Sequence, residues 1–154
     1  MTTRTPVILV VDDDAGCRDV AARLLEREGY ETRQAASGPE CLEIVRRERI
    51  DLVLLDVMMP DMDGLAVCTA LRDAAGTKHL PVILLTARSD MDTRLSGMHH
   101  GVSEFLTKPI NKFELFARVR AQLHILELAQ QLERVEENLH AVRRNLDPTA
   151  RTRS

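Results

Sequence analysis

The sequence predicts an α/β fold in which a doubly wound parallel sheet carries helices on both faces. Leu52 to Leu55 form an unbroken aliphatic run that stops at Asp56, and Val7 to Val11 form a second run that stops at Asp12. Short apolar runs bounded by polar residues are typical of strands buried on both faces, as in a parallel sheet. Strand and helix patterns then alternate along the chain with short connections. This alternation favours right-handed crossovers that place every strand-to-helix loop at one edge.

The first helix is expected from Ala15 to Glu28, with Gly29 as its C-cap and acids before its N-terminus. Its inward stripe is expected to comprise Val20, Leu24 and Leu25. The remaining elements are expected in this order: strand 31–35, helix 39–49, strand 52–55, helix 64–74, strand 82–85, helix 92–100, strand 105–106, and a last helix beginning near residue 111 or 112.

Composition limits the possible classes of protein. The 154 residues, 44% of them apolar, suffice for one domain and an appendage. A net charge of −3 gives no reason to expect nucleic acid or an anionic membrane as a partner, and no apolar stretch approaches a membrane span. The three cysteines show no metal spacing, and we expect buried thiols in a reducing cytoplasm.

Polar side chains stand where four predicted strands end. They are Asp12 to Asp14, Asp56, Thr86 and Lys108. Each of these signals alone is weak, because an Asp or Thr at a strand end more often caps a helix. Because the carboxyl ends of parallel strands share one edge, we expect these groups to be neighbours.

Clustered carboxylates need a compensating charge, since each like-charge pair at roughly 4 Å costs about 4 kcal/mol at an effective dielectric near 20. Oxygen ligands without imidazole or thiolate favour a hard cation such as Mg²⁺. Lys108 and Thr86 suit phosphoryl oxygens, and Asp56 could then attack phosphorus to give an acyl phosphate.

Four motifs give the chain a specific resemblance. They are Val-Asp-Asp at 11–13, Leu-Asp-Val-Met-Met-Pro-Asp-Met-Asp-Gly at 55–64, Leu-Thr-Ala at 85–87 and Phe-Leu-Thr-Lys-Pro at 105–109. On these motifs residues 6–124 resemble the receiver domain of response regulators in two-component signalling. The resemblance implies a flavodoxin-like five-stranded sheet in the order 2-1-3-4-5. It also implies a regulatory phosphoacceptor, not an enzyme acting on other substrates, that takes a phosphoryl group from a histidine kinase or phosphotransfer protein.

The resemblance assigns roles by position. Asp56 would be the phosphoacceptor. Mg²⁺ or Mn²⁺ would be held by Asp12, Asp13, Asp56 and the backbone carbonyl of Met58. The phosphoryl group would be bound by Thr86, Ala87 and Lys108, with a cis peptide bond between Lys108 and Pro109. Thr86 and Phe105 would form the switch. Asp14 adds a third acid to the usual pair and is expected to cap the helix, and Phe105 stands where the family often has Tyr.

Three other classes of protein are weighed against this one. An aspartyl-nucleophile phosphohydrolase of the haloacid-dehalogenase kind would need an acid two residues after its nucleophile, where this chain has Met58. A flavodoxin would need hydroxyls and glycines after the first strand, where Asp12 to Asp14 would repel a flavin phosphate. A pseudo-receiver acting only as a dimerisation module stays open, although its acids, Thr and Lys would then be unused.

The last helix is expected to run without a breaker to Pro148, well past the end of a receiver. Its apolar residues recur at alternating steps of three and four: Ile125, Leu128, Leu132, Val135, Leu139, Val142 and Leu146. This heptad pattern over residues 125–146 predicts a coiled coil, preferably a parallel homodimer, and a fraying amphipathic tail is the alternative. Residues 147–154 are expected to be disordered. An output domain outside this chain is a possible further partner.

Overall fold

Five parallel strands form a single sheet in the order β2-β1-β3-β4-β5. The structure is a computed structural model that describes residues 4–60, 62–87 and 101–146. The strands are β1 (Val7–Val11), β2 (Glu31–Ala35), β3 (Leu52–Asp56), β4 (Val82–Ala87) and β5 (Glu104–Lys108). The doubly wound sheet and its strand order are therefore confirmed.

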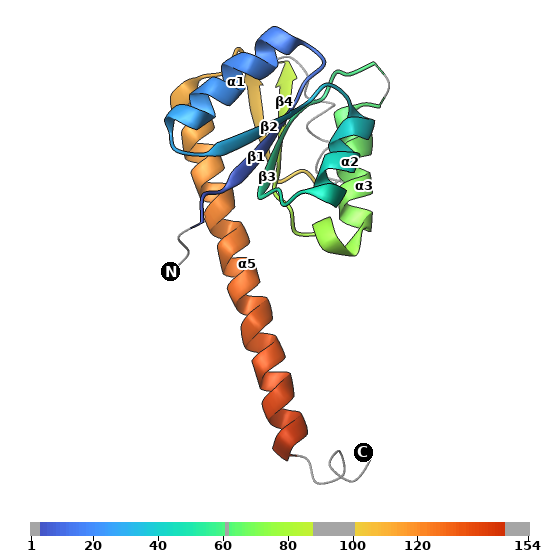
Figure 1. Cartoon of the computed structure of the whole chain (residues 1–154), viewed down its shortest axis with the longest axis vertical. Coiled ribbons are helices and arrows are strands. Elements are labelled where there is room, and N and C mark those ends of the chain that lie inside the picture. The colour runs from blue at the N-terminus through green and yellow to red at the C-terminus, as the bar shows by residue number, and fades with distance from the viewer. Residues whose placement is uncertain (1–3, 61, 88–100, 147–154) are drawn as a thin grey trace.

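Helices cover both faces of the sheet (Figure 1). They are α1 (Ala15–Arg27), α2 (Gly38–Arg47), α3 (Gly64–Asp73) and α5 (Lys112–Leu146), with a short 3-10 helix, η1 (Ala75–Thr77), after α3. Figure 1 shows α1 and α5 on one face and α2 and α3 on the other. The helix predicted at 92–100 lies outside the described residues.

The central strand β3 supplies side chains to both halves of the core. Leu52 and Leu54 pack with α1 and α5, whereas Val53 and Leu55 pack with α2 and α3, and all four are fully buried. Successive side chains of a strand point to opposite faces, so a strand covered on both sides must be apolar throughout. The uninterrupted run at 52–55 is the direct consequence.

Two details of the first helix differ from the prediction. Val20 is 58% exposed, because α1 buries Ala21, Ala22 and Leu25 instead and turns Val20 to solvent. Cys17 is also exposed, in the first turn of the helix, while Cys41 and Cys68 are buried as expected. Two small side chains, Ala21 and Ala22, therefore take the place on the buried side of α1 that the apolar pattern assigned to Val20.

The strands β4 and β5 are longer than the apolar runs from which they were predicted. Thr86 and Lys108 lie in the last two residue pairs that join β4 and β5. Thr86 is in register with Thr107, and Ala87 is in register with Lys108. The backbone at Thr86 and at Lys108 is thus fixed by strand pairing and does not belong to a loop. The peptide bond between Lys108 and Pro109 is cis.

Helix α5 has 35 residues and extends far beyond the sheet (Figure 1), a length of about 50 Å at 1.5 Å per residue. Only its first turns contribute buried residues, Leu115 and Val119. The seven seam residues are all between 50% and 75% exposed. Within the described residues, no helix is both long and apolar enough to cross a membrane. The tail at 147–154 lies outside the described residues.

Candidate phosphoacceptor and metal site

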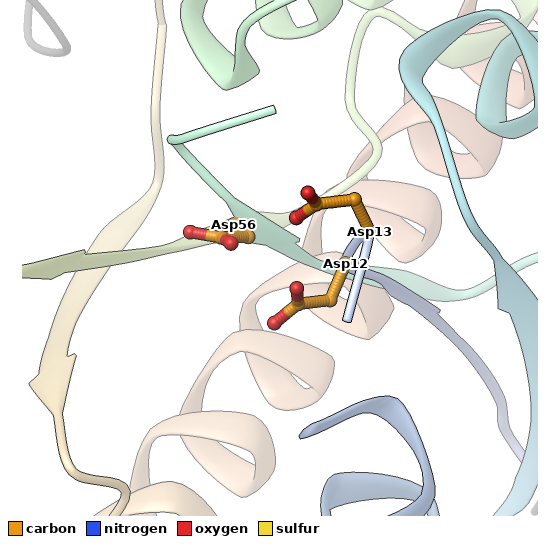
Figure 2. Close-up of side chains that lie close together, drawn as sticks. All are labelled: Asp12, Asp13 and Asp56. Atoms are coloured by element: carbon orange, nitrogen blue, oxygen red, sulfur yellow. The ribbon is translucent and has the colours of Figure 1, made fainter. Parts of the chain in front are cut away.

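Three carboxylates meet at the carboxyl edge of the sheet (Figure 2). Val11 is paired with Leu55, so the next residues, Asp12 and Asp56, leave adjacent strands side by side. One carboxylate oxygen from each of Asp12, Asp13 and Asp56 lies within 4.8 Å of the others. Asp12 and Asp56 are 2% and 5% exposed, whereas Asp13 faces solvent. The site is therefore an acidic cluster with one open side.

Lys108 brings a positive charge to this cluster from the far side of β4. Its Nζ atom lies 3.2 Å from Oδ2 of Asp56 and 3.4 Å from Oδ2 of Asp12. The Lys108 side chain is about one-third exposed, so the ammonium caps the buried pair of acids without being enclosed by them. A point charge in this position suits phosphoryl oxygens as well as carboxylates.

The pKa values of the pair follow from burial and mutual charge. Burial raises the pKa of Asp56, and the Asp12 carboxylate adds to this effect. The Met58 backbone N–H and the Lys108 ammonium act in the opposite direction but do not cancel the increase. Burial lowers the pKa of Lys108, but the carboxylates of Asp56 and Asp12 outweigh it, so the pKa is raised and the amine stays charged.

The acceptor carboxylate is oriented by backbone contacts from its own loop. The Met58 N–H donates to Oδ1 of Asp56 at 3.2 Å, which leaves Oδ2 toward Lys108. The following helix approaches closely, because a Cβ placed on Gly64 would lie 2.9 Å from the Val57 Cα and 3.0 Å from the Asp56 carbonyl oxygen. Gly64 thus permits an approach that fixes Asp56 between the sheet and α3, a role that the sequence analysis did not assign.

The acidic loop after β1 is braced by further contacts. The Asp14 N–H donates to Oδ1 of Asp12 at 2.9 Å, and the Arg18 guanidinium donates to the Asp12 carbonyl at 2.7 Å. Asp14 itself caps α1 by accepting from the N–H groups of Cys17 and Gly16, and these hydrogen bonds lower its pKa. Asp14 is therefore a helix cap, as expected. The bracing role of Arg18 left no recognisable signal in the sequence.

Thr86 carries the one orphaned buried polar atom found among the described side chains. Its residue is 1% exposed, and Oγ1 has no hydrogen-bond partner in the described structure. An unpaired buried hydroxyl costs roughly 1–3 kcal/mol, so a polar group that reached the carboxyl end of β4 would be stabilised by pairing with it. Ala87 follows it at the exposed end of β4.

The remaining expected site residues lie close to this edge. Phe105 is half-buried on β5 beside Leu84 and packs against the α2 and α3 side of the core. Met58 is 73% exposed in the loop that follows Asp56. The structure therefore places Met58 in the loop of Asp56 and Phe105 on the strand paired with that of Thr86, while the Met58 carbonyl as a metal ligand and Phe105 as a switch stay predictions.

The donor set fits a hard divalent cation. All three grouped ligands offer oxygen, and one, Asp13, is open to solvent. Mg²⁺ keeps several waters and is usually held by one or two carboxylates together with phosphate oxygens. Three carboxylates share one ammonium, so negative charge remains, and together with the open side at Asp13 this suits such a partly hydrated ion.

Comparison with known proteins agrees with this geometry. Residues 8–120 match the family described as "Response regulator receiver domain". The chain is 49% identical over 115 residues to Response regulator PleD of Caulobacter vibrioides, covering 74% of this chain and 25% of that protein. It is 45% identical over 116 residues to Response regulator MprA of Mycobacterium leprae, covering 75% of this chain and 50% of the relative. The chain thus spans a quarter to a half of the length of these relatives.

Solved structures show the same fold. A putative response regulator from Chloroflexus aurantiacus superposes with a TM-score of 0.76 at 35% identity, covering 79% of this chain and 99% of that one. The chemotaxis protein CheY4 of Vibrio cholerae gives a TM-score of 0.73 at 30% identity, covering 77% of this chain and 98% of that one. The chain belongs to the response-regulator receiver family of two-component signalling. Members of this family are regulatory phosphoacceptor domains that bind Mg²⁺ through an acidic pocket.

Proposed function

We propose that this chain is a switch in which Asp56 accepts a phosphoryl group from a histidine kinase or a phosphotransfer protein. The observation that carries the proposal is the approach of Lys108 Nζ to within 3.2 Å of Asp56 Oδ2. Asp56 is paired with Leu85, the residue before Thr86, whose buried hydroxyl has no partner among the described residues. A cation thus contacts the buried carboxylate, and an unpaired hydroxyl lies on the adjacent strand one position beyond the residue paired with it. This arrangement provides a nucleophile together with groups that bind the transferred oxygens.

The chemistry is a displacement at phosphorus. A carboxylate oxygen of Asp56 forms a bond to phosphorus while the bond from phosphorus to the donor nitrogen breaks, and the donor imidazole keeps the electron pair. The product is an acyl phosphate. Asp12, Asp13, Asp56 and the Met58 carbonyl would hold Mg²⁺ or Mn²⁺, which would offset the negative charge on both reactants. Lys108, the Thr86 hydroxyl and the Ala87 backbone would bind the phosphoryl oxygens.

The signal would leave the site through the sheet. Thr86 and Phe105 lie on the neighbouring strands β4 and β5, Phe105 in the second and Thr86 in the fourth of the five residue pairs that join these strands. A Thr86 hydroxyl drawn toward a phosphoryl group would vacate space beside β5 that the Phe105 ring could enter. The next element after β5 is α5, which carries the change out of the receiver at 6–124 and into the extension at 125–146.

The extension would act as a homodimeric coiled coil. Seven large aliphatic side chains, each at least half exposed, form a stripe along three heptads. Another face of the helix, formed by Leu126, Gln130 and Glu133, lies against the base of its own receiver. There Glu133 Oε1 is 3.0 Å from His79 Nε2. Since 3.6 residues make a turn, that face is roughly opposite the stripe. Each receiver would therefore lie on the outer side of a parallel pair, leading to an output domain or another partner.

Intact-mass spectrometry tests the phosphoacceptor directly. The chain is incubated with Mg²⁺ and acetyl phosphate, alongside Asp56→Asn and the matched control Asp63→Asn. Asp63 caps α3 in the same loop, and Asn preserves the cap. We expect one adduct on the wild type and on Asp63→Asn and none on Asp56→Asn. No adduct on the wild type would favour the alternative of a pseudo-receiver that serves only dimerisation. A phosphohydrolase, the other alternative, would turn over a phosphomonoester added to the wild-type chain and Mg²⁺, with release of inorganic phosphate.

A further inference from the structure

A second polar pocket lies at the base of the receiver, away from the acidic cluster. It is formed by the N-terminal segment, the residue before β2, the loop before β3 and one side of α5, and its volume is about 550 Å³. Four of its lining residues are arginines, Arg4, Arg49, Arg120 and Arg134, against two carboxylates, Asp51 and Glu127. The lining thus carries a local excess of positive charge although the chain has a net charge of −3, and this favours an anionic occupant.

The floor of the pocket already holds more positive than negative charge. Asp51 has a side chain that is 8% exposed, and its Oδ1 receives both Arg4 at 3.1 Å and Arg49 at 3.2 Å. Its Oδ2 accepts the Val7 N–H at 2.8 Å. One buried carboxylate thus holds two guanidiniums that line the pocket and are themselves partly exposed. An arginine has five N–H donors in a planar fork, so one carboxylate oxygen does not saturate it.

The wall contributed by α5 adds two more arginines and lies next to an aromatic ring. Among the residues that the structure describes, neither Arg120 nor Arg134 is within ion-pair distance of a carboxylate. Arg120 lies close to the Tyr30 hydroxyl. Tyr30 is half-buried, so one part of its ring packs on the core and the rest lines the pocket.

We propose that this pocket binds a nucleotide. The guanidiniums match the geometry of phosphate oxygens, and the exposed part of the Tyr30 ring, with the apolar edges of Pro6 and Leu123, offers a surface for a planar base. The volume lies within the range of small-molecule sites, roughly 300–1,000 Å³. One wall belongs to the receiver and the other to α5, so a bound nucleotide would bridge the domain and the helix that leaves it. The site uses none of the acidic-edge residues and is independent of the phosphoacceptor proposal.

Calorimetric titration of the full chain with ATP and with GTP tests this site. The buffer contains EDTA and no Mg²⁺, so that the acidic cluster cannot recruit a metal-bound phosphate. We expect binding of at least one of the two in the micromolar to low-millimolar range, weakened about tenfold by Arg120→Ala or Arg134→Ala. Glu127→Gln should tighten binding, because it removes a negative charge from the lining. Arg144→Ala deletes the same charge further along α5, outside the pocket, and should leave binding unchanged.

Two further titrations separate a nucleotide site from a patch of positive charge. Tyr30→Leu keeps apolar volume against the core, and its circular-dichroism melt verifies the fold. This variant should weaken ATP or GTP severalfold but should not change the binding of inorganic tripolyphosphate. The proposal is overturned if neither nucleotide binds, if Arg144→Ala weakens binding as much as Arg134→Ala, or if tripolyphosphate binds as tightly as ATP and Tyr30→Leu has no effect.

Discussion

The ammonium of Lys108 lies between two carboxylates that come from other strands, 3.2 Å from Asp56 and 3.4 Å from Asp12. β5 is separated from β3 by β4, so the side chain reaches past a whole strand to make both contacts. A single cation thereby compensates part of the charge of three clustered acids. Its removal should affect both the chemistry of Asp56 and the stability of the acidic edge.

Lys108→Ala should slow phosphorylation by acetyl phosphate about tenfold to a hundredfold, because a charge-assisted contact of about 1.5–3 kcal/mol with the transferred oxygens is lost. The rate is measured by intact-mass spectrometry at saturating Mg²⁺. Lys112→Ala is the matched control, since Lys112 is exposed at the start of α5 and lies over the Phe113 ring, away from the acids. Equal rates for Lys108→Ala and the wild type would show that the amine has no part in the transfer.

Asp56→Asn should stabilise the protein when no divalent cation is present. Burial raises the pKa of Asp56 above its ordinary value of 3.8, so the charged form is disfavoured in the folded state. The stabilising contribution of this group is complete below pH 3.8 and is lost as the pH rises through the raised folded-state pKa. At neutral pH the substitution should therefore raise the Tm by about 3 °C, equivalent to about 1 kcal/mol.

The advantage of Asp56→Asn should shrink as the pH falls through the raised folded-state pKa of Asp56 and should vanish below 3.8, where the carboxyl is protonated in both the folded and the unfolded state. It should also reverse in Mg²⁺, because a cation that binds the folded wild type stabilises it by mass action. Thermal melts at several pH values, with EDTA or with Mg²⁺, give both comparisons. A wild type that is more stable than Asp56→Asn in EDTA at pH 7 would mean that Lys108 compensates the acids fully.

Thr86→Val should be nearly neutral or slightly stabilising in the unphosphorylated protein. The hydroxyl it removes is buried and has no partner among the described residues, so its loss costs no hydrogen bond. Phosphorylation of Asp56 should still occur, yet the change in hydrogen exchange that it produces in β5 should be smaller than in the wild type. A fall in Tm of more than about 3 °C, near 1 kcal/mol, would indicate that the hydroxyl is satisfied in the folded protein.

The acids and the amine could be foreseen from the sequence because each stands where an apolar run stops. Parallel topology then sends all such ends to one edge, which is why Asp12, Asp56 and Lys108 were predicted as neighbours despite their separation in the chain. Apolar periodicity does not report how closely a helix lies on its sheet. For this reason Val20 was wrongly placed inside, where Ala21 and Ala22 pack instead.

Two kinds of contact could not be predicted from the sequence: the close approach of backbone at Gly64 and the ion pairs of Asp51. Gly64 belongs to a motif, yet nothing in its neighbours indicates that a Cβ would meet the Val57 backbone. The arginines around Asp51 come from the N-terminal segment and the loop before β3, and only the folded chain brings them to one carboxylate. Contacts between different elements could therefore not be predicted from the sequence where the residues do not stand at the end of an apolar strand. They became visible only in the structure.

Gly64→Ala should destabilise the protein by about 2 kcal/mol and impair phosphorylation together. The added methyl would lie 2.9 Å from the Val57 Cα and 2.8 Å from a Leu84 methyl, and backbone cannot move aside cheaply. Gly76→Ala is the control, because nothing lies within 4 Å of the position its Cβ would take. Denaturant melts and the acetyl phosphate assay measure the two effects. Equal stability of the two variants would show that α3 can shift away from Asp56 without cost.

The seam of α5 should set the oligomeric state. Leu132→Asp together with Leu139→Asp places two charges in the middle of the exposed stripe, where a partner helix would bury both side chains. We expect light scattering to report a dimer for the wild type and a monomer for this variant, and also for a chain cut at residue 124. Glu137→Lys changes a charge on the face away from the stripe and should remain dimeric.

The receiver should be unaffected by these changes, because neither leucine contributes to the two core clusters. Its thermal melt and its acetyl phosphate adduct therefore report on folding independently of assembly. A wild type that is monomeric at all concentrations would leave α5 as a single helix braced only by contacts such as the one between His79 and Glu133. A double variant that stays dimeric would instead place the interface on the receiver, and the cut at residue 124 would then also leave a dimer.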